Sequence, residues 1–294
     1  MNDAGIESEI NCGTLYVVAT PIGNLEDISA RALEILSSVS VIAAEDTRHS
    51  KALLQRYQIA TRMVSYHDFS NNAAVHKLLS QLEAGASIAL ISDAGTPLIS
   101  DPGYRLVSAA RDRGIAVFPV PGASALTAAL SVAGLPTDRF LFEGFLPAKT
   151  SARSQRLQEL SAETRTLVLY ESNHRILAAL QDMVAVLGGA RQIFVGRELT
   201  KKFETHYRGT LESALVWLQE DSNQQKGEFV LVIAGSDPRE EEDRQHQQAL
   251  QVVALLREEM SLNRAVAIAA RISGARKNRL YEAALAEPMD EQND

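Results

Sequence analysis

The chain has 294 residues, and its composition, 46% hydrophobic and 22% charged, is typical of a globular protein with a sizeable core. This length predicts two domains, with room for a small appendage. The formal net charge of −8 excludes a protein whose whole surface binds nucleic acid or membrane, although it allows a local basic patch. The single cysteine, Cys12, excludes an internal disulfide and a multi-cysteine zinc site.

The N-terminal segment 1–12 is polar and acidic, which is unlike a secretory signal peptide. A run of about 18 apolar residues, as a membrane-spanning helix requires, does not occur in the sequence. We therefore expect a cytoplasmic protein without a membrane partner, which also fits the use of only one cysteine.

Short β-branched runs alternate with helical patterns in the first half of the chain. The predicted strands are 15–19, 39–44, 88–92 and 115–120, and the predicted helices are 29–38, 47–57, 73–82 and 103–113. Alternation of this kind predicts a mostly parallel sheet covered by helices.

A second series of strands follows a turn at 133–138. These predicted strands are 140–145, 166–171, 192–198, 203–207 and 229–234. The runs 196–198 and 203–209 are close enough to form a hairpin, so this sheet is expected to be mixed rather than purely parallel.

The end of the chain has a different composition. An acidic linker is predicted at 235–248, followed by a helical tail to about residue 286. We therefore expect an α/β protein with one domain at 13–125, a second at 126–236, and a small helical C-terminal appendage with its linker at 237–290.

Four polar loops follow strands or apolar runs in the first half, at 20–27, 45–50, 92–103 and 119–126. In an open parallel sheet, ligands bind beyond the carboxyl ends of the strands, and all four loops are expected at that edge. The alternative is that they are ordinary connections, which also use Gly, Pro, Asp and Ser for turns and helix caps. Four such loops at one edge favour a ligand site.

The sequence also narrows the class of ligand. None of the 17 glycines lies two residues from another, and no G-x-x-x-x-G-K-[ST] stretch occurs, which disfavours a dinucleotide-binding site and a P-loop. The loops instead carry hydroxyl groups, small side chains and the carboxylates of Glu45, Asp46, Asp93 and Asp101. Such a set suits a ligand with ammonium and hydroxyl groups.

Six stretches carry a family resemblance: VATPIGNLEDIS, AAEDTR, SDAGTPLISDPG, PVPGASAL, LYESNHR and GRELTKKFE. In this order and spacing they resemble the S-adenosylmethionine-dependent tetrapyrrole methylase superfamily, over residues 13–286. Within it the chain is most similar to the branch that methylates cytidine 2′-hydroxyls of small-subunit rRNA. The porphyrin-precursor branches carry a G-P-G-D-P type of motif where this chain has Thr20-Pro21-Ile22-Gly23-Asn24, which favours the RNA branch.

The resemblance implies a two-domain tetrapyrrole-methylase-like fold, a homodimer, and S-adenosylmethionine as the methyl donor bound between the domains. The residues that it assigns to the donor are Pro21, Gly23, Asp93, Ala94, Gly95, Thr96, Ser124, Ala125, Leu169, Tyr170 and Glu171. For Asp93, a turn or helix cap is the alternative role.

The catalytic residues are less sharply predicted. A ribose hydroxyl is a weak acid, so a general base or a cation near the developing alkoxide is expected to help. Asp46, Glu45 and Arg48 directly follow a predicted strand and are the candidates, with His67, Glu198 and Lys201 further from the motif. Asp46 is equally suited to cap the helix that begins at Thr47.

The tail contains a basic stretch, 261–281, with five basic residues and no acidic one. Ala265, Ile268, Ala269 and Ile272 are expected to form one apolar helix face, with a break at Gly274. This pattern resembles a helix–turn–helix pair that contacts RNA, while the alternative is a helical hairpin packed on the body. The residues expected to contact RNA are Arg264, Arg271, Arg276, Lys277, Arg279, Lys201 and Lys202.

We therefore expect an enzyme that transfers a methyl group from S-adenosylmethionine to a cytidine ribose of small-subunit (16S) rRNA, in naked rRNA or in an assembled small ribosomal subunit. The alternatives are a methyltransferase for a small molecule such as a tetrapyrrole precursor, and a non-enzymatic RNA-binding assembly factor. No metal site is expected, because the six histidines lack ligand spacing.

Overall fold

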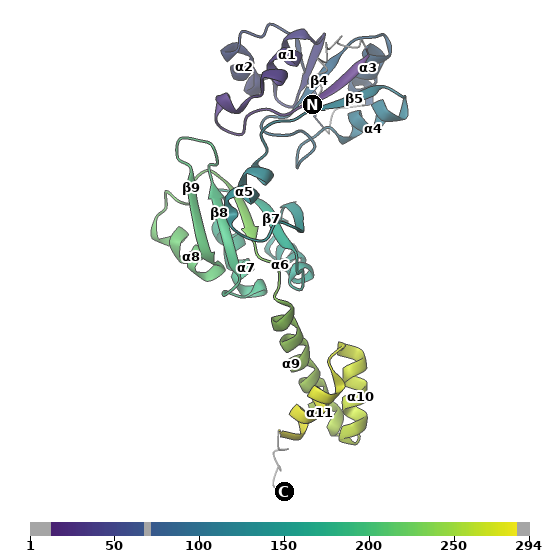
Figure 1. The fold of residues 1–294 in the computed structure, drawn as a ribbon, viewed down its shortest axis with the longest axis vertical. Coiled ribbons are helices and arrows are strands. Elements are labelled where there is room, and N and C mark those ends of the chain that lie inside the picture. Colours follow the sequence, from purple (N-terminus) through teal and green to yellow (C-terminus); the bar gives the residue numbers. More distant parts are fainter. Residues whose placement is uncertain (1–12, 68–71, 287–294) are drawn as a thin grey trace, which may run out of the picture.

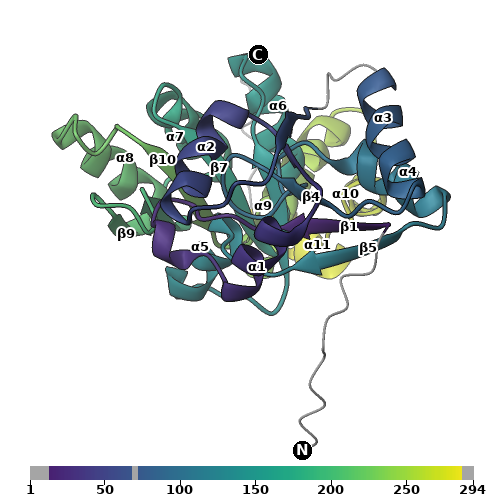
Figure 2. The same cartoon turned by 90° about the horizontal axis from the view of Figure 1, so that it is seen from above.

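The computed structural model describes residues 13–67 and 72–286, which form two α/β domains and a C-terminal helical module (Figure 1). The three parts follow one another along the long axis of the molecule, and Figure 2 shows the view along this axis. The expectations for Cys12 and the segment 1–12 lie outside the described residues.

The N-terminal domain is built on five parallel strands in the order β3-β2-β4-β1-β5. Their bounds are β1 Thr14–Val18, β2 Val41–Ala44, β3 Met63–Ser65, β4 Ile88–Ile91 and β5 Ala116–Val120. The parallel sheet confirms the predicted one. β3 was not predicted, because this three-residue edge strand is only half-buried and lacks the apolar run of the other strands.

Helices cover both faces of this sheet. They are the short 3-10 helix η1 Leu25–Asp27, α1 Ala30–Ser38, α2 Thr47–Arg56, α3 Asn72–Glu83 and α4 Tyr104–Asp112. Successive strand residues point to opposite faces, so Leu15 packs with α3 and α4 while Tyr16 packs with α1 and α2. Both faces are therefore buried, as the continuous apolar strands predict.

The second domain contains a mixed sheet in the order β6-β7-β10-β8-β9. The strands are β6 Phe140–Phe145, β7 Thr166–Ser172, β8 Gln192–Arg197, β9 Thr205–Thr210 and β10 Glu228–Ile233. Only β6 and β7 pair in parallel, whereas β8 and β9 form the predicted antiparallel hairpin.

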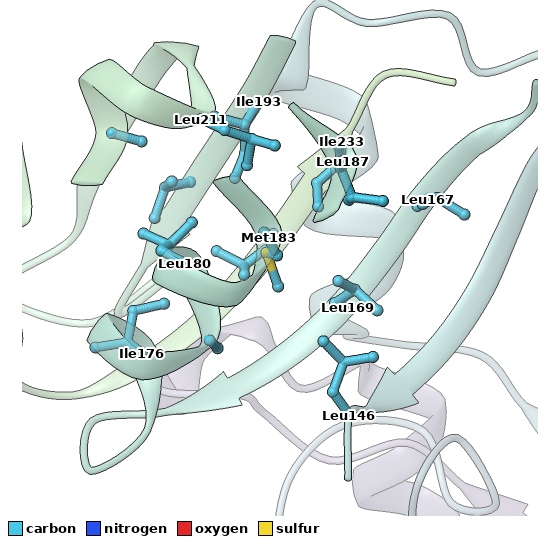
Figure 3. Packing of buried hydrophobic residues seen from close by; sticks show 14 of the residues in the cluster. Leu146, Leu167, Leu169, Ile176, Leu180, Met183, Leu187, Ile193, Leu211 and Ile233 are labelled. Atoms are coloured by element: carbon cyan, nitrogen blue, oxygen red, sulfur yellow. The ribbon is translucent and has the colours of Figure 1, made fainter. Parts of the chain in front are cut away.

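Different helices pack against the two faces of the mixed sheet. One face packs against α6 Thr150–Leu160, α7 Ile176–Leu187 and α8 Leu211–Glu220, with Met183 and Leu180 of α7 at its centre (Figure 3). The other face packs against α5 Ala125–Ala133, which follows the last strand of the first sheet. α5 thus joins the two domains beside the candidate ligand loops.

The C-terminal module consists of α9 Pro238–Arg257, α10 Leu262–Ser273 and α11 Lys277–Ala286. The prediction of a linker at 235–248 is wrong, because α9 begins at Pro238. Proline suits the first helical position, and the Glu and Gln residues that suggested a linker are good helix formers. Among the residues that the structure describes, the buried apolar core of the module comes from these three helices, and Met260 and Ala275 of the connecting turns pack against it.

The apolar face predicted for the tail is right in part. Ala265 and Ala269 are buried, and the helix ends at Gly274 in a left-handed conformation, as predicted. Ile272, however, is 71% exposed, and Val266 is buried instead. α10 packs against both α9 and α11, so its buried stripe differs from the one expected for a simple two-helix contact.

Candidate active site

The loop 92–103 is held by the ends of two neighbouring strands. Thr20, after β1, and Gly95 exchange two backbone hydrogen bonds, with N–O distances of 2.8 and 3.0 Å. The Thr96 hydroxyl donates to the carbonyl of Ala123 at 3.1 Å, which joins the loop to the segment before α5. The Asp46 backbone N–H donates to Asp93 Oδ1 at 3.0 Å, which adds the loop 45–50, so all four polar loops predicted at this sheet edge meet.

Backbone strain is concentrated where this loop faces the second domain. Five non-glycine residues in the described part of the chain have a positive φ, and four of them lie in two segments, the loop 92–103 and the turn between β8 and β9. Leu98 and Ser100 belong to the loop, with φ of 73° and 65°, and Glu198 and Thr200 belong to the turn between β8 and β9, with φ of 51° and 64°. Such conformations cluster at functional sites, where the surrounding structure holds them.

A cavity of about 280 Å³ lies between the domains, and we call it the first cavity. The loop 92–103 and the start of α5 form one side, and β7, β8 and β10 form the other. Seven residues predicted to bind the donor line it, namely Ala94, Gly95, Thr96, Ser124, Ala125, Tyr170 and Glu171. Ile22, Phe145 and Val230 add apolar surface to the same lining.

Tyr170 connects the second domain to the start of α5. Its hydroxyl accepts a hydrogen bond from the backbone N–H of Leu126 at 3.1 Å, while the N-cap residue Ser124 makes no side-chain cap bond. Burial raises the pKa of the Tyr170 phenol, so it stays protonated. Its ring meets Phe142 and Phe145 edge to face, with centroids 5.0 and 5.7 Å away.

Lys201 bridges the domains from the β8–β9 turn. Its Nζ donates to Glu198 Oε1 and Glu228 Oε2, both at 2.9 Å. Burial acts to lower the pKa of Lys201, but the hydrogen bonds to the two carboxylates outweigh it and raise the pKa. The lysine stem lies so close to Gly23 of the first domain that a Cβ there would overlap Lys201 Cγ.

A second cavity of about 500 Å³ adjoins the first on the side of α2. The two share Ile22, Ala94, Lys201 and Glu228 as lining residues. Three residues predicted to bind the donor, Pro21, Gly23 and Asp93, line only the second cavity. The predicted donor residues are thus divided between two adjoining cavities.

Asp46 is the N-cap of α2. Its Oδ1 accepts from the Arg48 backbone N–H at 2.8 Å and from Arg48 Nε at 3.1 Å, and its Oδ2 accepts from Arg48 Nη2 at 2.8 Å. The hydrogen bonds from Arg48 lower the pKa of Asp46 to about 2. The capping role is therefore confirmed, and a carboxylate held ionised in this way is a weak general base near neutral pH.

Asp101 lines the first cavity, and its pKa is shifted in the opposite direction from that of Asp46. Burial raises the pKa of its carboxyl to about 6, and the neighbouring charges of Glu45 and Asp93 raise it further against a hydrogen bond from Ser92. A cavity carboxyl with a pKa near working pH is suited to proton transfer. The sequence marked Asp101 as a pocket carboxylate but not as a base, because nothing local indicates its burial.

The other predicted site residues lie around the cavities in different ways. Glu45 borders the site, since its Oε2 accepts from the Asp93 backbone N–H at 3.4 Å. His67 is exposed and lines neither cavity. Leu169 lines neither cavity, its side chain packs in the core of the second domain (Figure 3), and its assignment to the donor stays a prediction. Lys202 lies over the exposed ring of Phe203, 5.5 Å from its centroid, and lines neither cavity.

The basic residues of the tail are exposed on the helical module, away from both cavities. They are Arg264, Arg271, Arg276, Lys277 and Arg279. Arg279 forms an ion pair with Asp243 of α9, its Nη2 being 2.7 Å from Oδ1, so part of its charge is used within the module. The cavities between the two α/β domains and the basic residues of the helical module therefore lie on separate surfaces.

Metal ligands do not gather anywhere in the described part of the chain. Within residues 13–67 and 72–286, no three or more His, Cys, Asp or Glu side chains are grouped as a metal site would require. In the same ranges, no helix combines the length and the apolar character needed to cross a membrane.

Comparisons with known proteins identify the family. Residues 14–215 match the family Tetrapyrrole (Corrin/Porphyrin) Methylases, and residues 243–287 match the RsmI C-terminal HTH domain. The chain is 51% identical to the ribosomal RNA small subunit methyltransferase I of Escherichia coli O157:H7, covering 93% of this chain and 95% of that one. It is 52% identical to the protein of the same name from Pseudomonas aeruginosa, covering 94% and 98%.

Solved structures show the same fold. Diphthine synthase superposes with a TM-score of 0.58 at 15% identity, covering 75% of this chain and 90% of that one. Cobalt precorrin-4 methyltransferase gives 0.57 at 15%, covering 76% and 95%. A Thermus thermophilus uroporphyrin-III C-methyltransferase complexed with S-adenosylhomocysteine gives 0.50 at 19%, covering 75% and 97%. Because the family match covers residues 14–215, more than half of the chain, the chain belongs to the tetrapyrrole methylase family.

Proposed function

We propose that this protein methylates the ribose 2′-hydroxyl of a cytidine in small-subunit rRNA, with S-adenosylmethionine as the methyl donor. The observation that carries the proposal is the inter-domain cavity, in a chain about half identical over nearly its whole length to proteins named ribosomal RNA small subunit methyltransferase I. The rRNA, naked or in an assembled small subunit, is the proposed partner, and the cytoplasm the proposed location.

The chemistry of the first cavity fits the donor. Apolar walls such as Phe145 and Val230 suit an adenine ring, and carboxylates such as Asp101 suit an ammonium and a sulfonium group. Gly95, with its left-handed backbone, lets the loop approach a ligand closely. When bound, the donor supplies a methyl group on a positively charged sulfur, which is already activated for transfer.

We assign the general-base role to Asp101 rather than to Asp46. The Asp101 carboxylate faces the cavity and would accept the proton of the ribose hydroxyl as its oxygen attacks the methyl carbon and the carbon–sulfur bond breaks. Its proton affinity rises during this step, because the positive charge that faced it is neutralised. Asp46 lacks this advantage, since its bonds to Arg48 keep it ionised.

The test is to incubate the protein and labelled donor with undermodified small subunits, naked small-subunit rRNA, or a porphyrin precursor. Label in a cytidine 2′-O-methyl group is the expected result. Label in the porphyrin precursor alone would establish the small-molecule alternative, and binding of rRNA without transfer would establish the assembly-factor alternative.

Two matched variants test the base. Asp101→Asn is expected to lower the rate of methyl transfer at saturating donor by about 10²-fold or more. Asp46→Asn keeps a capping side chain and is expected to stay near wild type. The assignment is wrong if Asp101→Asn transfers methyl as fast as wild type, or if only Asp46→Asn is impaired.

A further inference from the structure

The second cavity has a feature that indicates a ligand of its own. Ser50, on the first turns of α2, lines this cavity and is only 4% exposed. Its hydroxyl oxygen finds no hydrogen-bond partner among the residues that the structure describes. A buried hydroxyl without a partner costs folding free energy, and a ligand in the cavity would supply the missing bond.

The lining of the cavity combines the basic side chains of Arg48, His49 and Lys201 with the carboxylates of Asp93 and Glu228. Arg48, whose side chain is 90% exposed, and His49 stand at the α2 side, and Lys201 stands at the wall shared with the first cavity. Arg48, whose side chain bonds Asp46 only through its Nε and Nη2, and His49 suit the phosphates beside one nucleotide, while Lys201 is already paired with two carboxylates. Asp93 lines the same cavity, and its Oδ1 accepts from the Asp46 backbone N–H at 3.0 Å, which fixes the carboxylate.

We infer that the second cavity binds the single RNA nucleotide that receives the methyl group, turned out of its strand. The inference rests on the proposed function. The shared wall of Ile22, Ala94 and Lys201 would place its ribose between the cavities, within reach of a methyl group held in the first cavity. Enzymes that do chemistry on a base turn the target nucleotide out of its strand into a pocket, and we extend this geometry to an enzyme that acts on the ribose.

The carboxylate of Asp93 gives the site a base preference. An ionised carboxylate only accepts hydrogen bonds, and cytosine offers an amino group where uracil has a carbonyl oxygen. Asp93 is therefore a specificity residue of the acceptor site, rather than a donor-binding residue as the resemblance implied. The cavity should prefer cytidine to uridine by about tenfold, and Asp93→Asn should remove that preference.

The decisive experiment fills the second cavity. Ala52 lines it on α2, whereas the preceding residue, Lys51, lines neither cavity and is exposed. Ala52→Trp is expected to lower rRNA methylation by about 10²-fold because the acceptor is no longer positioned, with S-adenosylhomocysteine affinity within about twofold of wild type. Lys51→Trp, which adds the same ring outside the cavity, is the matched control and is expected to stay active.

Ser50→Ala gives a second readout through the unpartnered hydroxyl. Cytidine 3′,5′-bisphosphate is the probe, titrated by calorimetry into the full chain with S-adenosylhomocysteine present. The variant is expected to bind it about fivefold more weakly than wild type and to melt at the same or a higher temperature. If the hydroxyl had only a structural role, its removal would not weaken bisphosphate binding while leaving the melting temperature unchanged or higher.

The outcomes separate this inference from the proposed function. If wild type methylates rRNA and Ala52→Trp is as active as Lys51→Trp, the acceptor site is overturned while the proposed function stands. It is also overturned if the bisphosphate competes with S-adenosylhomocysteine instead of binding beside it. If the wild-type protein methylates no rRNA, both the proposed function and the acceptor site are overturned.

Discussion

At the scale of single residues, the carboxylates around the two cavities differ in pKa because their surroundings differ. Arg48 bonds to Asp46 and keeps it ionised, whereas burial beside Glu45 and Asp93 favours the protonated form of Asp101. A group whose pKa lies near 6 changes charge close to physiological pH. Its titration should therefore be visible in both the stability and the ligand affinity of the protein.

The first prediction concerns stability and pH. The pKa of Asp101 in the folded protein is about 6, above its ordinary value of 3.8, so between these values the folded state holds a proton that the unfolded state releases. This contribution is fully present below pH 4 and disappears as pH rises through 6. Urea midpoints measured from pH 4 to 7 should show it as a wild-type minus Asp101→Asn difference that declines with pH. A difference that is flat or grows would contradict the raised pKa.

The second prediction concerns the donor. A cationic ligand in the first cavity favours ionised Asp101, so donor affinity should fall by up to about tenfold per pH unit below pH 6. Titration calorimetry from pH 5 to 8 measures this slope. Asp101→Asn should remove it, while Asp46→Asn should keep it. Equal slopes in wild type and Asp101→Asn would show that another group controls the affinity.

The third prediction uses two glycines with the same backbone conformation. Gly95 and Gly114 have φ of 81° and 70°, but a Cβ at Gly95 would lie 3.3 Å from Ile22 Cγ2, whereas nothing lies within 4 Å of one at Gly114. Changing either to Ala should cost about 1–2 kcal/mol of stability. Only Gly95→Ala should also weaken donor binding, by about tenfold, which corresponds to about 1.4 kcal/mol. Similar donor affinities in the two variants would remove Gly95 from the site.

At the scale of elements, the cleft is formed by one helix and one turn that cross the domain boundary. α5 follows the first sheet but packs on the second, and its N-terminus is capped by Tyr170 rather than by its own Ser124. On the opposite side, the Thr200 hydroxyl accepts from the Asn24 backbone N–H at 3.2 Å. The Thr200 contact joins the two domains directly, and the Tyr170 contact fixes the start of the helix that connects them.

The fourth prediction tests the helix cap. Tyr170→Phe keeps the ring but removes the oxygen that accepts from Leu126, leaving the α5 N–H without its partner. The expected loss of stability is about 1 kcal/mol, with a weaker donor affinity because Ser124 and Ala125 line the cavity. Urea unfolding and donor titration measure the two effects. Tyr104→Phe, at an exposed residue of α4, is the control, and a similar loss there would refute the cap argument.

At the scale of the whole molecule, the helical module carries the basic tail residues away from the cleft (Figure 1). Among the described residues, its apolar core contains side chains from 249–284 alone, so this core is formed by the helices of the module itself. The alternative of a hairpin packed on the body is therefore not what the chain adopts. The homodimer implied by the family resemblance stays a prediction.

The fifth prediction concerns RNA binding by this module. The slope of log affinity against log salt should become shallower by about 0.7–0.9 for every phosphate that the module no longer neutralises. Replacing Arg264, Arg271 and Lys277 together by Gln should weaken rRNA binding and flatten this slope, with donor affinity unchanged. Arg279 is left intact because it pairs with Asp243. The control replaces Arg31 and Lys77, exposed on the N-terminal domain, and equal slopes in both variants would show that the tail does not bind RNA.

The sequence by itself determined the two sheets, the β8–β9 hairpin, the polar loops at one edge and the family, because these depend on local periodicity and short motifs. It did not determine which of those polar residues share a cavity. Asp93 and Gly95 are two positions apart, yet they line different cavities. The raised pKa of Asp101 depends on burial and on Glu45, and the position of Lys201 depends on contact with Gly23, far away in the chain. Only the tertiary structure sets such long-range distances and burial, and these decide the chemistry of the site.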